Sequence, residues 1–144
     1  MPNTYYTLIT GASEGFGKSL AFECAARKMN LILVALPGSG LVYLAELIKR
    51  DYQVDVITIE KDLTSEENCK EVYQLVYDWK LPVNMLINNA GLGGTMLFSE
   101  GDFSFYQKQI KLNIITTTLL THLFLDMLKT NSPAYILNVG SLGS

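Results

Sequence analysis

The sequence predicts a doubly wound α/β domain, in which helices cover both faces of a parallel sheet that is truncated after its fifth strand. Short, continuously apolar runs alternate with helix-length segments, and such runs are typical of parallel strands buried on both faces. Small or polar residues follow every predicted strand, at the edge where sheets of this class bind ligands. The 144 residues, 49% of them hydrophobic, suffice for one core, so we expect residues 1–144 to form a single domain.

The first strand, first helix and second strand are predicted near the N-terminus. Residues 5–9 are aromatic, β-branched and aliphatic, which favours a strand, and a glycine-rich turn follows them. Residues 16–28 carry apolar side chains at helical spacing. Residues 31–35 are wholly aliphatic and are followed by a proline- and glycine-containing turn at 37–40, which indicates the second strand.

The next three elements are a helix, a strand and a helix. Residues 41–50 are predicted to be helical, and residues 54–59, which are rich in valine and isoleucine, to be the third strand. A third helix is predicted over residues 64–79. Thr64 and Glu67 have the spacing of a capping box, in which each side chain binds the backbone amide of the other residue, so we expect this helix to begin at Thr64.

The last two strands flank two helices. Residues 83–87 and 134–139 are predicted to be the fourth and fifth strands, and residues 99–111 and 113–129 to be two separate helices between them. The second of these helices is the most apolar long stretch, but its polar side chains favour a buried helix over a membrane span. We expect His122, the only histidine, to be a structural residue of this buried helix.

Composition argues against several classes of function. A net charge of −3 without basic clusters argues against nucleic acid as a partner, because phosphate binding needs a surface rich in lysine or arginine. Cys24 and Cys69 do not form a metal-binding pattern, so we expect no metal and a reducing, cytoplasmic location. The N-terminus does not resemble a signal peptide, and no membrane partner is expected. Charged residues make up only 17% of the chain, which indicates a surface that another segment or subunit covers.

The turn after the first predicted strand is the strongest candidate for a ligand site. Gly11 permits the tight turn, Gly15 lets the backbone approach a pyrophosphate, and Gly17 lets the helix pack closely. The free N–H groups and positive dipole end of the following helix then favour an anion. The alternative is an ordinary glycine-rich turn. The residues that we assign to cofactor binding here are Gly11, Ser13, Glu14, Gly15, Phe16 and Gly17.

Polar or small residues also follow the second, third and fourth predicted strands. One interpretation of Asp62 is that it accepts a hydrogen bond from an adenine edge, with Leu63 against the ring face. The alternative is that Asp62 is a solvated turn residue. The Asn-Asn-Ala-Gly run at 88–91 suits a site where the backbone approaches a ribose and the amide side chains tie strands together; the alternative is a polar turn. The cofactor-binding residues assigned here are Leu36, Asp62, Leu63, Asn89, Ala90 and Gly91.

These motifs together resemble the short-chain dehydrogenase/reductase family over essentially the whole chain. The family's TGxxxGxG motif corresponds to residues 10–17, its aspartate after the third strand to Asp62, and its NNAG motif to residues 88–91. Phe16 stands where the family usually has isoleucine. The resemblance implies a Rossmann-like fold that binds NAD or NADP.

The resemblance also implies an activity and two catalytic residues. The family transfers a hydride between a nicotinamide dinucleotide and an alcohol or carbonyl carbon of a small molecule, using an Asn-Ser-Tyr-Lys tetrad, and its members are usually homodimers or homotetramers. Asn113 matches the tetrad asparagine, which supports a water in a proton relay, and Ser141 matches the serine that binds the substrate oxygen. Judged without the family, Asn113 is a helix cap and Ser141 an ordinary turn residue.

The tetrad's tyrosine and lysine have no counterpart among these residues, because none of the eight tyrosines has a lysine four positions later. This acid–base pair is essential to the chemistry, so we expect the chain alone to be inactive. Three interpretations are open. The chain is the N-terminal part of a longer reductase, which we favour, or a non-catalytic nucleotide-binding sensor, or an interaction module without a ligand.

The choice between NAD and NADP is left undetermined by the residues after the second strand. Leu36 and Pro37 offer neither the carboxylate that binds the ribose of NAD nor the arginine that binds the phosphate of NADP. Glu14 would repel a 2′-phosphate, whereas the turn at 38–40 has N–H groups and a hydroxyl to offer one.

Overall fold

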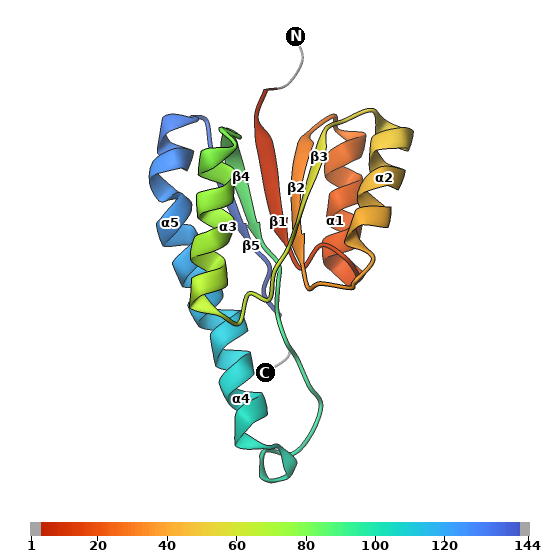
Figure 1. Cartoon of the computed structure of the whole chain (residues 1–144). Coiled ribbons are helices and arrows are strands. Elements are labelled where there is room, and N and C mark those ends of the chain that lie inside the picture. The colour runs from red at the N-terminus through yellow and green to blue at the C-terminus, as the bar shows by residue number, and fades with distance from the viewer. Residues whose placement is uncertain (1–3, 142–144) are drawn as a thin grey trace.

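The computed structural model, which describes residues 4–141, confirms the predicted parallel sheet (Figure 1). Its five strands lie in the order β3-β2-β1-β4-β5, and all four neighbouring pairs are parallel. The polypeptide reverses its direction of travel across the sheet between β3 and β4, which flank the β2-β1 pair. The strands are β1 (Tyr6–Thr10), β2 (Asn30–Ala35), β3 (Val56–Glu60), β4 (Val83–Asn88) and β5 (Tyr135–Asn138).

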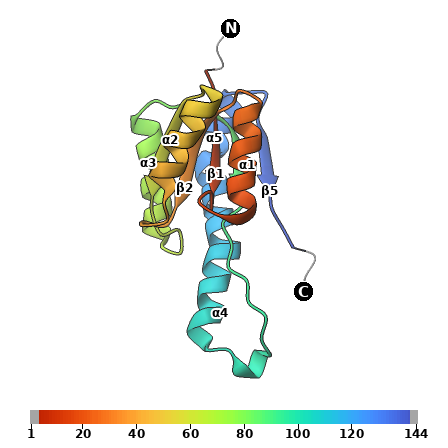
Figure 2. The same ribbon diagram turned by 90° about the vertical axis from the view of Figure 1, so that its right-hand side faces the viewer.

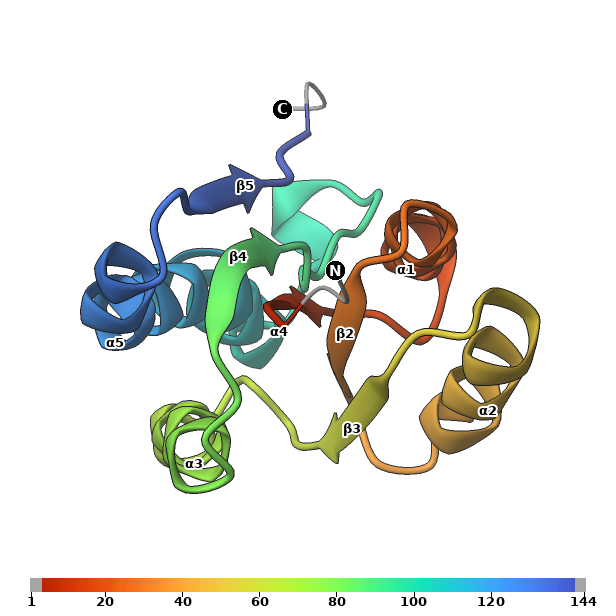
Figure 3. The same ribbon diagram turned by 90° about the horizontal axis from the view of Figure 1, so that it is seen from above.

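Helices cover both faces of this sheet, as predicted. Figure 3 shows α1 and α2 on one side of the strands and α3 and α5 on the other. Side chains alternate across a strand, so Ile9 of β1 enters the core under α1 and α2, whereas its neighbour Leu8 enters the core under α3 and α5. The four covering helices are α1 (Gly15–Ala26), α2 (Leu41–Tyr52), α3 (Glu66–Asp78) and α5 (Thr117–Thr130).

The N-cap of helix α3 lies one residue later than the capping box in the sequence predicts. Ser65 is the N-cap, and its Oγ accepts a hydrogen bond from the Asn68 amide at 3.2 Å. The capping box predicted for Thr64 and Glu67 is therefore wrong. Thr64 is instead held against Asp62, because its hydroxyl and its amide both donate to Oδ1 of Asp62, at 2.7 and 3.0 Å.

The predicted break between two helices near residue 112 is also wrong. Helix α4 (Phe103–Ile110) continues through a π-helical turn, η2 (Lys111–Thr116), directly into α5. No glycine or proline lies between residues 102 and 132, so nothing in the backbone ends the helix. The segment before α4 is a loop with one short 3-10 turn, η1 (Phe98–Glu100).

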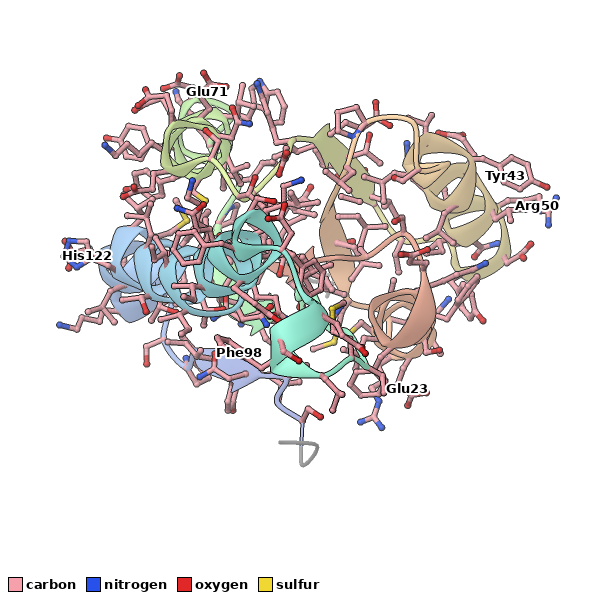
Figure 4. The ribbon with its side chains drawn as sticks, turned by 90° about the horizontal axis from the view of Figure 1, so that it is seen from below. Glu23, Tyr43, Arg50, Glu71, Phe98 and His122 are labelled. Atoms are coloured by element: carbon pink, nitrogen blue, oxygen red, sulfur yellow. The ribbon has the colours of Figure 1, made fainter. Side chains whose placement is uncertain are left out.

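Two parts of the molecule extend beyond this covered core. Helix α4 projects past the carboxyl ends of the strands and has no buried residue, and β5 forms one edge of the sheet with all four residues exposed (Figure 2). His122, which we expected to be buried, is exposed and points away from the body of the molecule (Figure 4). Within residues 4–141, no helix combines the length and apolar character needed to cross a bilayer.

The Tyr6 hydroxyl at the start of β1 provides a test of the structure at high pH. It donates a hydrogen bond to Asp55 Oδ2, and burial together with this carboxylate raises the pKa of Tyr6 from 10.0 to about 12. The folded state therefore holds the phenol proton more tightly than the unfolded state, which stabilises the fold below pH 10. We expect the free energy of unfolding, measured with urea, to fall as the pH rises from 10 to 12.

This fall should be smaller in Tyr6→Phe, which has no phenol to ionise. Tyr43→Phe is the matched control, because the Tyr43 side chain is exposed. A pH profile of Tyr6→Phe that coincides with that of the parent chain would contradict the assignment.

Candidate functional site

A cavity of about 840 Å³ lies at the carboxyl ends of the strands, where the sequence places the polar motifs. The turns after β1, β2, β3 and β4 form its walls, and helix α4 with the start of η2 closes one side. A second hollow of about 490 Å³, between the C-terminal ends of α3 and α5, contains none of the predicted site residues. The large cavity is lined by Gly11, Ser13, Glu14, Ala35, Leu36, Pro37, Gly38, Ser39, Lys61, Asp62, Leu63, Thr64, Asn89, Ala90, Gly91, Leu92, Phe105, Lys108 and Leu112.

The glycines of the first turn differ in what they make possible. Gly11 and Gly15 have φ angles of +63° and +56°, in the left-handed region that favours glycine. A Cβ at Gly15 would meet no described atom within 4 Å, so the backbone there faces open space. A Cβ at Gly17 would lie 2.1 Å from the Gly11 carbonyl oxygen and 2.3 Å from Asn89 Nδ2. Gly17 therefore lets the first turn of α1 lie directly against the loop and the neighbouring motif.

The start of α1 has backbone donors and no side-chain cap. Glu14 is the N-cap, with extended backbone at φ −151°, and its carboxylate makes no capping hydrogen bond. The first turn of α1 contains no acidic residue. The N–H groups of a helix start have no partner within the helix, and they carry the positive end of its dipole. This end of the cavity is consequently suited to an anion.

Thr10, the last residue of β1, holds the turns after β1 and β4 together. Its buried hydroxyl oxygen accepts hydrogen bonds from the backbone amides of Asn89 and Ala90, at 3.0 and 2.9 Å. In return, Asn89 Nδ2 donates to the carbonyl oxygens of Thr10 and Gly11, both at 3.1 Å. The Asn89 side chain thus positions the rim, and the surface that this motif presents to the cavity is largely backbone.

Asp62 is an anion with one oxygen already engaged. The hydroxyl and amide of Thr64 donate to Oδ1, and these bonds, with the positive charge of Lys108, hold the pKa of Asp62 below its ordinary value. Its second oxygen, Oδ2, accepts no hydrogen bond within the described residues. Asp62 is therefore able to hold the entry to α3 and to accept a hydrogen bond from a ligand with the same carboxylate.

The apolar walls of the cavity come from side chains with very different exposure. Leu36, directly after β2, is 57% exposed, which leaves a broad apolar face towards solvent and the cavity. Leu63 is only 4% exposed and belongs to the core under α3 and α5, so it contributes a small part of the cavity floor. The cavity therefore has an apolar surface beside the Asp62 carboxylate, a combination suited to a flat heteroaromatic ring.

The sequence position of Asn113 alone suggested a helix cap. In the structure Asn113 lies within the π-helical turn η2, and its side chain holds the backbone of Leu92. Its Oδ1 accepts a hydrogen bond from the Leu92 amide at 2.8 Å, and its Nδ2 donates to the Leu92 carbonyl oxygen at 3.0 Å. A Cβ at Gly91 would lie 3.2 Å from the same Oδ1, so Gly91 packs closely against the Asn113 side chain. Asn113 thereby fixes the loop that leaves the NNAG motif.

The structure brings most of the predicted site residues together around the cavity, but five lie outside its lining. Gly15, Phe16 and Gly17 form the start of α1 beside it, and the Phe16 side chain is 59% exposed. Asn113 lies behind the Leu92 loop, and Ser141 follows β5 as an exposed residue outside the cavity wall.

Sequence reasoning did not assign Thr10, Lys61 or Lys108 to the site, and it considered Ser39 only as a hydroxyl that the turn at 38–40 offers to a 2′-phosphate. Thr10 is signalled by its place as the polar end of an apolar strand. Lys61 ion-pairs with Glu71 at 2.5 Å, and the Ser39 hydroxyl oxygen is buried without a hydrogen-bond partner among the described residues. Lys108 comes from α4, and no local pattern indicates that this helix reaches the cavity.

These features fit a nicotinamide dinucleotide. The uncapped start of α1 suits the phosphates, and the Asp62 carboxylate beside Leu36 suits the adenine. The long shape of such a ligand agrees with a cavity that touches the ends of four strands. Within the described part of the chain, no group of three or more histidine, cysteine, aspartate or glutamate side chains is arranged to hold a metal ion.

Known proteins share both this sequence pattern and this fold. The chain is 34% identical over 147 residues to a very-long-chain 3-oxoacyl-CoA reductase of Kluyveromyces lactis, in a match that covers 96% of this chain and 42% of that protein. Among solved structures, a bulky-bulky ketone specific alcohol dehydrogenase from Comamonas testosteroni superposes with a TM-score of 0.88, at 29% identity, over 97% of this chain and 56% of that one.

A short-chain dehydrogenase from Sphingobium yanoikuyae, solved in complex with NADPH, gives a TM-score of 0.86 at 30% identity, over 96% of this chain and 54% of that one. The chain thus spans about half the length of these relatives, or less. A family model described as short chain dehydrogenase matches residues 6–144. With its parallel sheet, glycine turn and NNAG rim, this chain belongs to the short-chain dehydrogenase family.

Proposed function

We propose that residues 1–144 form the NAD(P)-binding part of an oxidoreductase that transfers a hydride between nicotinamide and an alcohol or carbonyl carbon of a small molecule. The observation that carries this proposal is the single cavity at the carboxyl ends of β1, β2, β3 and β4, which joins the uncapped helix start, Asp62 and the NNAG backbone. The NADPH bound to the Sphingobium yanoikuyae relative supports the class of cofactor. The cofactor is NAD or NADP.

In this proposal, different parts of the rim hold different parts of the dinucleotide. The backbone amides at Gly15, Phe16 and Gly17 bind the phosphates, with Ser13 and Glu14 beside them. Asp62 accepts a hydrogen bond from the adenine, while Leu36 and Leu63 contact the ring. The backbone of Asn89, Ala90 and Gly91 borders the ribose. The bound nicotinamide ring supplies the chemistry of donating or accepting the hydride.

Two residues of this chain are proposed to serve the proton chemistry. The Ser141 hydroxyl donates a hydrogen bond to the substrate oxygen. Asn113 supports a proton-relay water while its side chain clamps Leu92. The tyrosine and lysine of the family tetrad are not in this sequence, so the 144 residues alone bind nucleotide without turnover. The second candidate is a non-catalytic nucleotide-binding protein. It is favoured because the cavity is formed while the tyrosine and lysine are not in this sequence.

The exposed apolar side chains on and around β5 and α4 support a further part of the proposal. We propose that the full-length protein is a homodimer or homotetramer, and that these surfaces are covered in it. Both cysteines are free and buried, which supports a reducing, cytoplasmic location. The apolar residues in question include Phe98, Phe103, Ile110, Tyr135 and Ile136.

Isothermal titration of the chain with NAD⁺ and NADP⁺ tests the proposed function. We expect at least one nucleotide to bind, and Asp62→Asn to weaken it by roughly tenfold, because a hydrogen bond to a charged group contributes about 1.5 kcal/mol. Asparagine keeps an oxygen for Thr64, so the turn itself is retained. Asp78→Asn is the matched control: Asp78 accepts a hydrogen bond from Gln74 on the exposed side of α3, away from the cavity.

Failure of both nucleotides to bind would overturn the proposed function. Turnover of alcohols or ketones by the 144-residue chain would overturn its inactivity. An intact mass near 16.0 kDa for the protein isolated from its natural source would favour the non-catalytic candidate over the longer reductase.

A further inference from the structure

The turn that precedes α3 and the π-helical turn η2 meet at one buried hydroxyl. Thr116, the last residue of η2, is 3% exposed, and its Oγ1 donates a hydrogen bond to the carbonyl oxygen of Leu63. Figure 1 shows the segment between β3 and α3 passing beside the junction of α4 and α5. Thr116 therefore connects the loop that carries Asp62 and Leu63 to the helix that carries Asn113.

The same hydroxyl has a second acceptor on its own helix. Thr116 Oγ1 also lies 2.9 Å from the carbonyl oxygen of Lys111, at the first residue of η2. A hydroxyl has a single hydrogen, so it cannot donate fully to the Leu63 and Lys111 carbonyls at once. A change that strengthens one of these hydrogen bonds must weaken the other.

The Thr116 hydroxyl and its acceptor on Leu63 lie in a buried part of the molecule. The Leu63 carbonyl oxygen also accepts a hydrogen bond from the Cys69 thiol at 3.5 Å. Both residues are buried, with Leu63 4% and Cys69 0% exposed. Water is thus kept away from the junction, and in a poorly hydrated interior neighbouring hydrogen bonds polarise one another. The hydrogen bonds that join the loop to the helix therefore influence one another.

The helix side of this junction leads to the second turn of the cavity. Asn113 lies between Lys111 and Thr116 in η2, and its side chain makes both hydrogen bonds to the Leu92 backbone. π-helical turns are rare and are frequently found at functional sites. Here the π-helical turn connects the Leu63 carbonyl on one side to the Leu92 loop on the other.

We propose that Thr116 is a positioning residue that couples occupancy of the adenine end of the cavity to the orientation of Asn113. A ligand at Asp62 and Leu63 changes the strength of the hydrogen bond that the Leu63 carbonyl accepts from Thr116. The Thr116 hydroxyl then donates more to one of its two acceptors, Leu63 or Lys111, and less to the other. The turn that holds Asn113 then adjusts. This inference rests on the proposed function, because it requires a nucleotide to bind beside Asp62.

Titration with adenosine monophosphate, followed by NMR of the ¹⁵N-labelled chain, tests the proposal. This probe carries the adenine end of the dinucleotide without the nicotinamide, and Asn113 is not part of the cavity lining. We expect the probe to shift the amide resonances of Asp62 and Leu63 and also the side-chain amide of Asn113. In Thr116→Val the Leu63 response should persist while the Asn113 response is lost.

Two further variants separate coupling from simple structural damage. Thr116→Ser keeps the hydroxyl and should restore the Asn113 response. Thr118→Val is the matched control, because Thr118 Oγ1 bonds to a carbonyl of its own helix, that of Ile114 at 2.8 Å, on the exposed side. It should leave both responses unchanged.

If Thr116→Val does not fold, the parent chain still provides a measurement that can overturn the coupling. A Leu63 response without an Asn113 response overturns the coupling and leaves the proposed function standing. A missing response at both Asp62 and Leu63 overturns the proposed function and the coupling with it. An Asn113 response of full size in folded Thr116→Val also overturns the coupling, since the shift then arises through space.

Discussion

Replacing Gly17 by alanine is expected to destabilise the chain by about 3 kcal/mol, because the added methyl overpacks against a backbone oxygen that cannot rotate aside. The added Cβ would lie 2.1 Å from the Gly11 carbonyl oxygen and 2.3 Å from Asn89 Nδ2. The first of these atoms is backbone, and the second holds the carbonyls of Thr10 and Gly11. Relief of the clash therefore requires α1 to move away from the turn. Urea unfolding and nucleotide titration measure the two consequences.

We expect nucleotide binding in Gly17→Ala to be lost along with stability, since the helix start and the rim separate. Gly93→Ala is the control, because a Cβ there meets no described atom within 4 Å and the backbone has no positive φ. It should unfold and bind like the parent chain. Parent-like stability of Gly17→Ala would show that the close contact between α1 and the rim is incorrect.

Replacing Thr10 by valine should have the next largest effect. Valine has a similar shape but cannot accept the hydrogen bonds that the backbone amides of Asn89 and Ala90 donate to the Thr10 hydroxyl oxygen, at 3.0 and 2.9 Å. Both hydrogen bonds are part-buried, and an amide left without a partner in a buried site costs about 1–3 kcal/mol, so we expect the two amides together to lower the unfolding free energy by roughly 3 kcal/mol. Chemical denaturation measures this loss, and hydrogen exchange should show faster exchange at the amides of residues 89 and 90.

Thr10→Ser keeps the hydroxyl, and it should recover most of the stability and the slow exchange at both amides. The control for loss of a threonine hydroxyl in general is Thr118→Val, where the hydroxyl is exposed and bonds only within its helix. Equal stability of Thr10→Val and Thr118→Val would be incompatible with Thr10 as the link between the two turns.

The sheet was predictable from the sequence because its determinants are local. Each strand is a continuous apolar run, and a parallel strand buried on both faces needs nothing else to be recognised. The N-cap of α3 was missed by one residue, because Thr64 and Ser65 are both good caps and the contact of Thr64 with Asp62 favours Ser65. The fusion of α4 and α5 through η2 was missed for a related reason. Asn113 suggested a helix start, whereas its partner is Leu92, 21 positions away.

The candidate site also contains residues that local sequence spacing indicates and residues that only the fold brings to it. The glycines of the first turn, Asp62 and the NNAG run were found because their spacing along the chain reflects what each turn must do. Thr116 and Lys108 were not found, since each matters through a residue that the fold brings close from another element. Lys61 lines the cavity because the end of β3 lies beside the end of β2 in the sheet.

The central place of β1 in the strand order determines when the rim is completed during translation. The ribosome releases β1, β2 and β3 in sequence, and these strands are neighbours that pair in register without β4. The Thr10 hydroxyl, by contrast, receives the amide of a residue 79 positions later. Contacts between distant residues form late because the loop between them must first be synthesised and closed. Relative to the rest of this sheet, the glycine turn is therefore translated early, directly after β1, and gains its final partners late.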